Sequence, residues 1–193
     1  MPNAILDPTG LEGSGEPQGG APVRQAGRES LAPRRDLRGA TVGLLENTKQ
    51  NAALFLQELG RLLVDRHGAA GFVLRTKTAF ALPVSDELLD ELTRRCDVVI
   101  TGVGDCGSCS ASAVADGVAF ERHGTPAAVI CSDAFGPSAD AMARLQGVPG
   151  YHYLTTPHPV AVLAPDEVRE RALLALPEVV SVLLRGRERE GAA

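Results

Sequence analysis

The sequence predicts an α/β fold in which helices cover both faces of a mostly parallel β-sheet, and three observations lead to this prediction. Short apolar segments rich in branched residues recur along the chain, and segments with apolar residues at helical spacing separate them. The length of 193 residues suits one domain with a single core. Parallel strands need crossover connections, so we expect a three-layer sandwich of the flavodoxin-like or Rossmann-like kind.

The sequence divides into an extended N-terminal arm at residues 1–37 and one α/β domain at residues 38–193. The arm is dense in Gly, Pro, Glu and Arg from Gly10 onward and has no apolar periodicity, which is typical of a linker. Ahead of it, "AILDPTG" (Ala4–Gly10) is a short apolar stretch closed by a turn signal. This stretch is either a frayed end or a strap that docks on its own or a neighbouring subunit.

In the first half of the domain, the sequence pattern predicts two strands and two helices. "ATVGLLEN" from Ala40 is a branched, apolar run that suits a buried strand. The next segment has leucines and a phenylalanine at helical spacing, and Gly68 would end that helix. The following elements are a strand at Gly71–Lys77 and a helix at Ser85–Arg95, in which Ser85 is the N-cap.

The second half repeats the alternation. We expect strands at Cys96–Gly104, Pro126–Ser132 and Tyr151–Thr156. We expect helices at Ser108–Arg122, Pro137–Leu145 and Pro165–Arg185, the last being one helix or two helices broken at Pro177.

Composition narrows the class of ligand. The net charge of −5 and the scattered basic residues argue against nucleic-acid binding, and an aromatic content of 4% argues against a stacking platform. There is no apolar run of the roughly 18 residues that a membrane helix needs, and no secretory signal. We therefore expect a cytoplasmic protein in a reducing setting that binds a small, polar molecule and has no membrane partner.

Polar side chains follow the predicted strands at their carboxyl ends, where ligands bind in open parallel sheets. We predict that these residues converge on one site, with two cysteines and a histidine as its catalytic groups. The catalytic candidates are Cys106, Cys109 and His158. The predicted substrate-binding residues are Asn47, Lys49, Asn51, Ser108, Ser132 and Asp133.

The two cysteines in "GDCGSCSA" favour thiol chemistry. Cys106 and Cys109 straddle the start of a helix that directly follows a strand, where unpaired N–H groups and the helix dipole stabilise a thiolate. Cys109, one turn later, is placed to resolve an adduct on Cys106 by closing a disulfide. A zinc site needs about four ligands, and neither Cys96 nor Cys131 has a partner nearby in sequence. Those two thiols suit packing within strands.

Other residues leave alternatives open. "GVGDCG" has glycines that either cradle a phosphate or permit a tight turn. His158 lies between two prolines and is either an acid–base group or a surface residue. Lys49 either orients a carboxylate or phosphate or is solvated. Asp105 opposes thiolate formation beside Cys106 unless it points away, which suggests proton handling or metal contact.

Four stretches together resemble the UGSC-motif proteins, relatives of the selenoprotein B subunits of glycine, sarcosine, betaine and D-proline reductases. The stretches are "ILDPTG", "TVGLLENTKQNA", "GDCGSCSA" and "TTPHP". The resemblance implies a nucleophile at Cys106, where the family can place selenocysteine, with Cys109 as its partner. The larger reductases act on an activated amino acid with a separate carbonyl-bearing subunit, and this chain has no such segment.

We therefore expect a thiol-dependent enzyme in which Cys106 attacks a small polar substrate, in reductive cleavage or in carbon–sulfur bond chemistry. No cofactor is predicted beyond a thiol reductant or a partner protein that supplies electrons. The alternatives are a non-catalytic thiol carrier within a larger assembly, a racemase or lyase that pairs Cys106 with His158, and a metal site formed by the two thiols with Asp105 and His158. Exposed sheet ends and the N-terminal strap favour a homo-oligomer.

Overall fold

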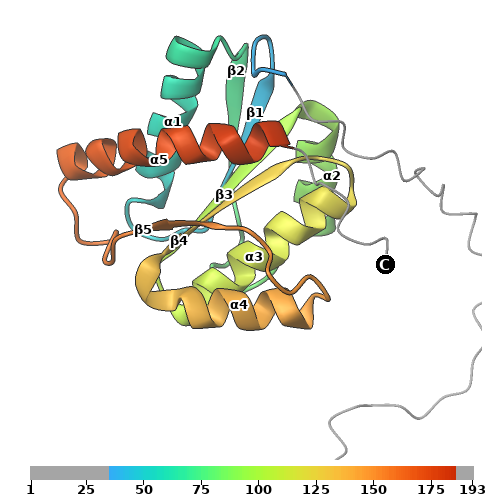
Figure 1. Cartoon of the computed structure of the whole chain (residues 1–193), viewed down its shortest axis with the longest axis vertical. Helices are drawn as coiled ribbons and strands as arrows, with labels where there is room; N and C mark the ends of the chain where they lie inside the picture. Colours follow the sequence, from blue (N-terminus) through green and yellow to red (C-terminus); the bar gives the residue numbers. More distant parts are fainter. Residues whose placement is uncertain (1–34, 186–193) are drawn as a thin grey trace, which may run out of the picture.

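The structure is a computed structural model that describes residues 35–185 (Figure 1). Five strands form one parallel sheet in the order β2-β1-β3-β4-β5, which confirms the α/β, flavodoxin-like prediction. The strands are β1 (Thr41–Glu46), β2 (Gly71–Thr76), β3 (Val98–Gly104), β4 (Ala127–Ser132) and β5 (Leu154–Thr156). Most of the predicted N-terminal arm, residues 1–37, lies outside the described residues, so its separation from the domain stays a prediction.

Five α-helices cover the two faces of the sheet. They are α1 (Ala52–His67), α2 (Asp86–Arg95), α3 (Gly107–Arg122), α4 (Gly136–Leu145) and α5 (Pro165–Arg185), with a short 3₁₀ turn, η1 (Asp133–Phe135). Helices α1 and α5 pack together on one face, and α2, α3 and α4 lie on the other (Figure 1). None of the described helices is long and apolar enough to cross a membrane.

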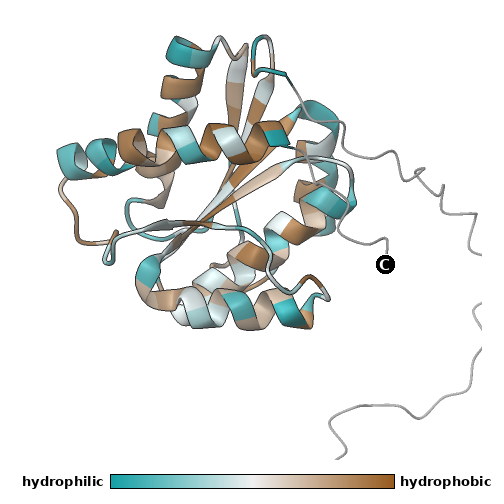
Figure 2. Ribbon diagram, in the orientation of Figure 1, coloured by the Kyte–Doolittle hydropathy of each residue, from teal (hydrophilic) through white to brown (hydrophobic). Residues whose placement is uncertain are grey.

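The core consists of apolar residues on both faces of the central strands. All residues of β3 and β4 are buried, as parallel strands between helical layers require. Leu44 and Ile100 pack toward α1 and α5, whereas Leu45 and Val99 pack toward α2 and α3. Figure 2 shows the outcome, with brown segments along the central strands and alternating brown and teal along α5. Each helix thus turns one apolar side to the sheet.

Local sequence signals explain several helix ends. Ser85 caps α2, because its side chain accepts a hydrogen bond from the N–H of Leu88. Gly68 ends α1 in the left-handed conformation, with φ of 69°, which glycine adopts without a Cβ penalty. Pro177 lies within α5 and does not divide it, so one of the two predicted alternatives for this segment is correct.

The predicted last strand is longer than the observed one. We expected Tyr151–Thr156, but β5 contains only Leu154–Thr156. The N–H of Tyr151 bonds to Val148 in a turn that follows α4, and the Tyr153 hydroxyl bonds to Gly136 and Asp140. These two tyrosines therefore bond to the helices and their connecting turn and do not extend the sheet. The apolar pattern of the sequence did not indicate this.

The strand order reverses between β1 and β3, which is where ligands bind in sheets of this kind. The two strands pair in parallel up to Glu46 and Gly102, so the loops that follow them leave the same edge of the sheet. We call this edge, formed by the carboxyl ends of the strands, the carboxyl edge. The loops after β3 and β4 and the segment after β5 also lie at the carboxyl edge.

Candidate functional site

The cysteine pair forms the start of α3 at the carboxyl edge. Cys106 is the N-cap, and its sulfur accepts a hydrogen bond from the N–H of Cys109 at 3.3 Å. The two sulfurs form a disulfide, and the two Cα atoms lie 5.1 Å apart. Cys106 is partly exposed, whereas Cys109 is fully buried. An electrophile from solvent therefore meets Cys106 first.

Serine hydroxyls surround the loop between β3 and α3. The Ser108 hydroxyl lies 3.6 Å from the Cys106 sulfur and is exposed. The carbonyl of Gly104 accepts two hydroxyl donors, Ser110 at 3.0 Å and Ser132 at 3.1 Å. These two buried hydrogen bonds fix the end of β3 to both α3 and β4, which holds the cysteine loop in place.

His158 and Asp105 form a hydrogen-bonded pair next to the cysteines. The Nδ1 of His158 lies 2.9 Å from Oδ1 of Asp105, whose side chain is 4% exposed. The second oxygen of Asp105 accepts the N–H groups of Val160 at 3.0 Å and Ala161 at 2.9 Å. The carboxylate thus joins the cysteine loop to the segment after β5.

The electrostatics of Asp105 determine which histidine nitrogen is free. Burial acts to raise the pKa of Asp105, but hydrogen bonds from the N–H groups of Ala161 and Val160 and from Ser132 and His158 hold this pKa below its usual value. An ionised carboxylate only accepts hydrogen bonds, so Nδ1 of His158 carries the proton. The other nitrogen, Nε2, has no hydrogen-bond partner among residues 35–185 and is free to accept a proton.

Ser132 does not complete a serine triad with this pair. Its hydroxyl lies 3.3 Å from Nδ1 of His158, the same nitrogen that faces Asp105. A serine nucleophile would instead bond to the opposite nitrogen, Nε2. Ser132 therefore holds the end of β3 through its bond to Gly104 and is not placed as a serine nucleophile.

Two further contacts fix the histidine. The N–H of His158 donates to Asp133 at 3.0 Å, and the ring of Phe135 meets the imidazole edge-to-face with centroids 5.2 Å apart. Arg171 of α5 donates to the carbonyl of Pro157 at 2.9 Å. The histidine is thus held from η1, and the backbone of the preceding residue is held from α5, while the side chain of His158 stays 37% exposed.

The loop after β1 is also tied to the cysteine loop. Asn47 donates from Nδ2 to the carbonyl of Val103 at 2.8 Å, and its Oδ1 is buried with no partner among the described residues. Asn51 donates to the carbonyls of Val160 at 3.0 Å and Leu163 at 2.9 Å. Both amides therefore position the loop rather than project into open solvent.

The structure brings together most of the predicted site residues. Direct contacts join Ser108 to the cysteine pair and His158 to Ser132 and Asp133. Asn47 and Asn51 border this group through backbone carbonyls. Lys49 instead lies over the ring of Phe80, with 4.2 Å between its ammonium and the ring centroid. The free thiols Cys96 and Cys131 are buried, and burial raises the pKa of Cys131 to about 12.

A buried ion pair beneath the loop after β2 was missed by the sequence analysis. Lys77 and Asp116 are 2% and 1% exposed, and the Lys77 ammonium bonds to both Asp116 and Ser112 of α3. Burial raises the pKa of Asp116 to about 6 and lowers that of Lys77 below its usual value. One signal for this pair was present in the sequence, a lysine directly after a strand. Asp116 gave none, because an aspartate within a helix is usually on the surface.

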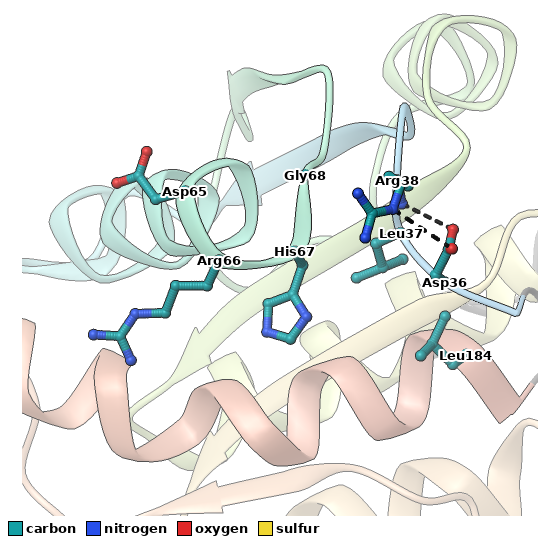
Figure 3. A pocket seen from close by; sticks show the side chains of 8 residues that line it. All are labelled: Asp36, Leu37, Arg38, Asp65, Arg66, His67, Gly68 and Leu184. Atoms are coloured by element: carbon teal, nitrogen blue, oxygen red, sulfur yellow. Dashed lines mark hydrogen bonds and ion pairs between the residues drawn. The ribbon is translucent and has the colours of Figure 1, made fainter.

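A surface hollow lies at the opposite edge of the sheet. Figure 3 shows it between the end of α1, the segment before β1 and the end of α5. Asp36 and Arg38, which face this hollow, bond to each other. No cysteine or histidine of the candidate site lines it. The hollow is therefore separate from the candidate site at the carboxyl edge.

Metal-ligand geometry is absent from the described part of the chain. Among residues 35–185, no three His, Cys, Asp or Glu side chains gather closely enough to hold a metal ion. Asp105 and His158 are bonded to each other, and the two thiols are joined as a disulfide. The alternative of a metal site built from these four residues has no support in this geometry.

Comparison with known protein families gives a match that includes the cysteine motif. No curated protein matches the chain significantly. The model of the UGSC family matches residues 4–185, which includes the whole sheet and the Cys106-Gly107-Ser108-Cys109 motif. This match covers most of the chain, and the chain therefore belongs to the UGSC family.

Proposed function

We propose that this protein is a thiol-dependent enzyme in which Cys106 attacks a small polar electrophile and Cys109 resolves the adduct. The observation that carries the proposal is the asymmetry of the pair, a partly exposed Cys106 at the start of α3 bonded to a fully buried Cys109. The free N–H groups and positive dipole end of α3 favour a thiolate at this position.

The Asp105–His158 pair supports an acid–base role beside the thiol. Asp105 directly precedes Cys106 in the cysteine loop, so the imidazole of His158 that it binds lies next to that loop. With Nδ1 protonated toward Asp105, Nε2 of His158 is the nitrogen that can take a proton from the Cys106 thiol and return it to a leaving group. The Cys106 thiolate supplies the nucleophile, and His158 handles the proton.

A balanced reaction uses both cysteines. In the first step the Cys106 sulfur bonds to the substrate carbon as the carbon–leaving group bond breaks, and the leaving group departs with its electron pair and a proton from His158. In a reductive second step the Cys109 thiolate attacks the Cys106 sulfur, the carbon–sulfur bond breaks, and the carbon keeps the electron pair and takes a proton. The carbon gains two electrons, the cysteines form a disulfide, and an external thiol reductant restores them.

The resemblance of the cysteine motif to that of the selenoprotein B reductase subunits supports the direction of this chemistry. In the selenoprotein B reductase subunits that the UGSC proteins resemble, the first position of the motif can hold selenium, which is both a strong nucleophile and a good leaving group. We propose the same role for the sulfur of Cys106. If the second step does not occur, the first step leaves Cys106 joined to the substrate carbon by a stable carbon–sulfur bond, and the chain is modified once without turnover.

The proposal is tested by alkylating the reduced protein with iodoacetamide across pH and reading each cysteine by mass spectrometry. We expect Cys106 to react with a midpoint below the pKa of about 8.5 of a free cysteine thiol. Cys109→Ser should keep this fast reaction and Cys106→Ser should lose it. A midpoint at or above 8.5, or metal bound in stoichiometric amount that protects both thiols, would contradict the proposal.

A second candidate function is a thiol carrier within a larger assembly, and the exposed sulfur of Cys106 supports this as well. The two functions differ in turnover. With a chemically reactive small acid and excess dithiol, an enzyme releases product repeatedly, whereas a carrier is modified once per chain and stops. The ratio of product to protein, measured in the same sample as the adduct mass, separates them.

A further inference from the structure

The chain contains only two lysines, and both lie at the carboxyl edge. Lys77 follows β2 and is paired in the interior with Asp116. Lys49 follows β1, is partly exposed, and has no acidic partner among residues 35–185. Its ammonium contacts the ring of Phe80, which attracts a cation without cancelling its charge. Lys49 is therefore a positive group that can still bind an anion.

The loop between β2 and α2 is fixed on α3 at several points. The Lys77 ammonium bonds to Ser112 at 2.7 Å and to Asp116. The Ser112 hydroxyl donates to the carbonyl of Leu82 at 2.6 Å, and the N–H of Val84 donates to Asp116 at 2.7 Å. Phe80 lies in the chain between these bonded residues, so the buried ion pair fixes the position of its ring.

The same anchors place this loop beside the thiols. Ser108 and Ser112 are four residues apart on α3, so they share one face of the helix. The loop bonded to Ser112 thus lies one turn from Ser108, whose hydroxyl is 3.6 Å from the Cys106 sulfur. From the other side, Asn47 bonds to Val103 at 2.8 Å and brings the loop that carries Lys49 next to the cysteine loop.

We infer that the Lys77–Asp116 pair positions Phe80, and that Phe80 in turn keeps Lys49 at the edge of the thiol site. The charge of Lys49 then makes the site select electrophiles that carry an anionic group. Lys49 is the specificity-determining residue, and Lys77, Asp116 and Phe80 act through it. The substrate class that fits is a small carboxylate with its reactive carbon near the charge. This inference rests on the proposed function for its relevance to catalysis.

The test compares two probes of similar size, of which one carries a negative charge and the other is neutral. Iodoacetate and iodoacetamide both react with the thiolate, forming a sulfur–carbon bond as the carbon–iodine bond breaks and iodide leaves. The ratio of their rate constants at Cys106 is therefore independent of the thiolate fraction. It is measured in the phosphine-reduced full chain and compared with a free cysteine peptide. We expect the protein ratio to exceed the peptide ratio about threefold, and to fall as salt is added.

Variants locate the cause of the selectivity. Lys49→Gln should reduce the ratio to that of the peptide, whereas Arg66→Gln, which removes one positive charge at the opposite edge of the sheet, should leave it unchanged. The double variant Lys77→Met with Asp116→Leu replaces the ion pair by apolar groups, and we expect it to lower the ratio toward that of Lys49→Gln. If this variant does not fold, Phe80→Leu keeps every anchor and should lower the ratio by a smaller factor.

The outcomes separate this inference from the proposed function. A fast reaction of Cys106 whose ratio does not depend on Lys49 overturns the inference and keeps the thiol enzyme. A slow reaction whose ratio does depend on Lys49 contradicts the proposed function and keeps the inference. A third outcome is that the ratio depends on Lys49 but does not change in the Phe80→Leu variant or in the double variant. This outcome overturns the positioning role of the Lys77–Asp116 pair.

Discussion

Asp105 is the residue on which the geometry of the site depends most. Its two oxygens accept the imidazole of His158 and the N–H groups of Val160 and Ala161. It is almost fully buried, so each donor would lose its partner in the interior if the carboxylate were removed. Unpaired buried donors cost free energy, which is why a single carboxylate can hold a whole segment in place.

Asp105→Asn should both destabilise the protein and reverse the histidine tautomer. The neutral amide loses the charge-assisted hydrogen bonds that the carboxylate accepts, at a cost of about 1–3 kcal/mol in the free energy of unfolding. If the amide nitrogen faces Nδ1 of His158, the imidazole proton moves to Nε2. Denaturant unfolding and the nitrogen chemical shifts of the imidazole check the two effects.

Asp133→Asn is the matched control for this experiment. Asp133 is exposed and accepts one N–H, that of His158, and the asparagine oxygen can accept the same bond. We expect a change below about 0.5 kcal/mol and no change of tautomer. Equal effects of the two variants would contradict the central role of Asp105.

At the scale of elements, the close contact between β3 and α3 places the cysteine motif. Gly104 ends β3, and a Cβ at this position would lie 2.7 Å from the Cα of Ser110 and 3.0 Å from the sulfur of Cys131. The backbone of α3 therefore approaches the strand as closely as it does because Gly104 has no side chain. The start of the helix, and Cys106 with it, depends on that approach.

Gly104→Ala should push the first turn of α3 away from the sheet. A helix backbone cannot yield as a flexible side chain can, so we expect a loss of about 1–3 kcal/mol in the free energy of unfolding. The labelling rate of Cys106 should change as well, since its capping position shifts. Gly71→Ala is the control, because a Cβ there meets nothing within 4 Å. Comparable losses in both variants would show that the close contact is not the cause.

Sequence patterns predicted the elements well where one segment alone determines the structure. Branched apolar runs predicted β1, β3 and β4, and Ser85 and Gly68 marked helix ends that the structure has. Prediction failed where contacts between residues far apart in the sequence determine the structure. Tyr151 and Tyr153 contribute to contacts with helices rather than to β5, and the partner of Lys77 is 39 residues away in the chain.

The candidate site followed from a rule about the whole sheet rather than from any one motif. Parallel strands bring their following loops to one edge, so the sequence alone groups His158 and Asp133 with the cysteines. What the rule could not give is the pairing within that group. Nothing in the sequence indicates that Nδ1 of His158 faces Asp105 or that Lys49 contacts Phe80.

At the scale of the whole molecule, the Lys77–Asp116 pair gives stability a dependence on pH. Burial raises the pKa of Asp116 to about 6, above the value of about 3.9 expected in the unfolded chain. The folded state therefore binds a proton more readily than the unfolded state between these values. The contribution of this group to stability is fully present below about pH 4 and is lost as pH rises through about 6.

Asp116→Asn removes this dependence. As pH falls from about 6 to about 4, we expect the free energy of unfolding of the natural protein to rise relative to that of the variant, by about 1.4 kcal/mol for each unit of pKa difference. Asp90→Asn, on the exposed face of α2, is the control variant over the same range. Denaturant unfolding at several pH values measures both, and a constant difference for Asp116→Asn would contradict the prediction.

The loops of the site are joined through backbone groups more than through pairs of side chains. Asn47 and Asn51 donate to carbonyls, and Asp105 and Asp133 accept N–H groups. A backbone group is present whichever side chain stands at its residue, so Ala161 can change its side chain without losing the bond that Asp105 needs. Positions such as Ala161 are therefore where substitutions can vary the surface of the site while its frame stays intact.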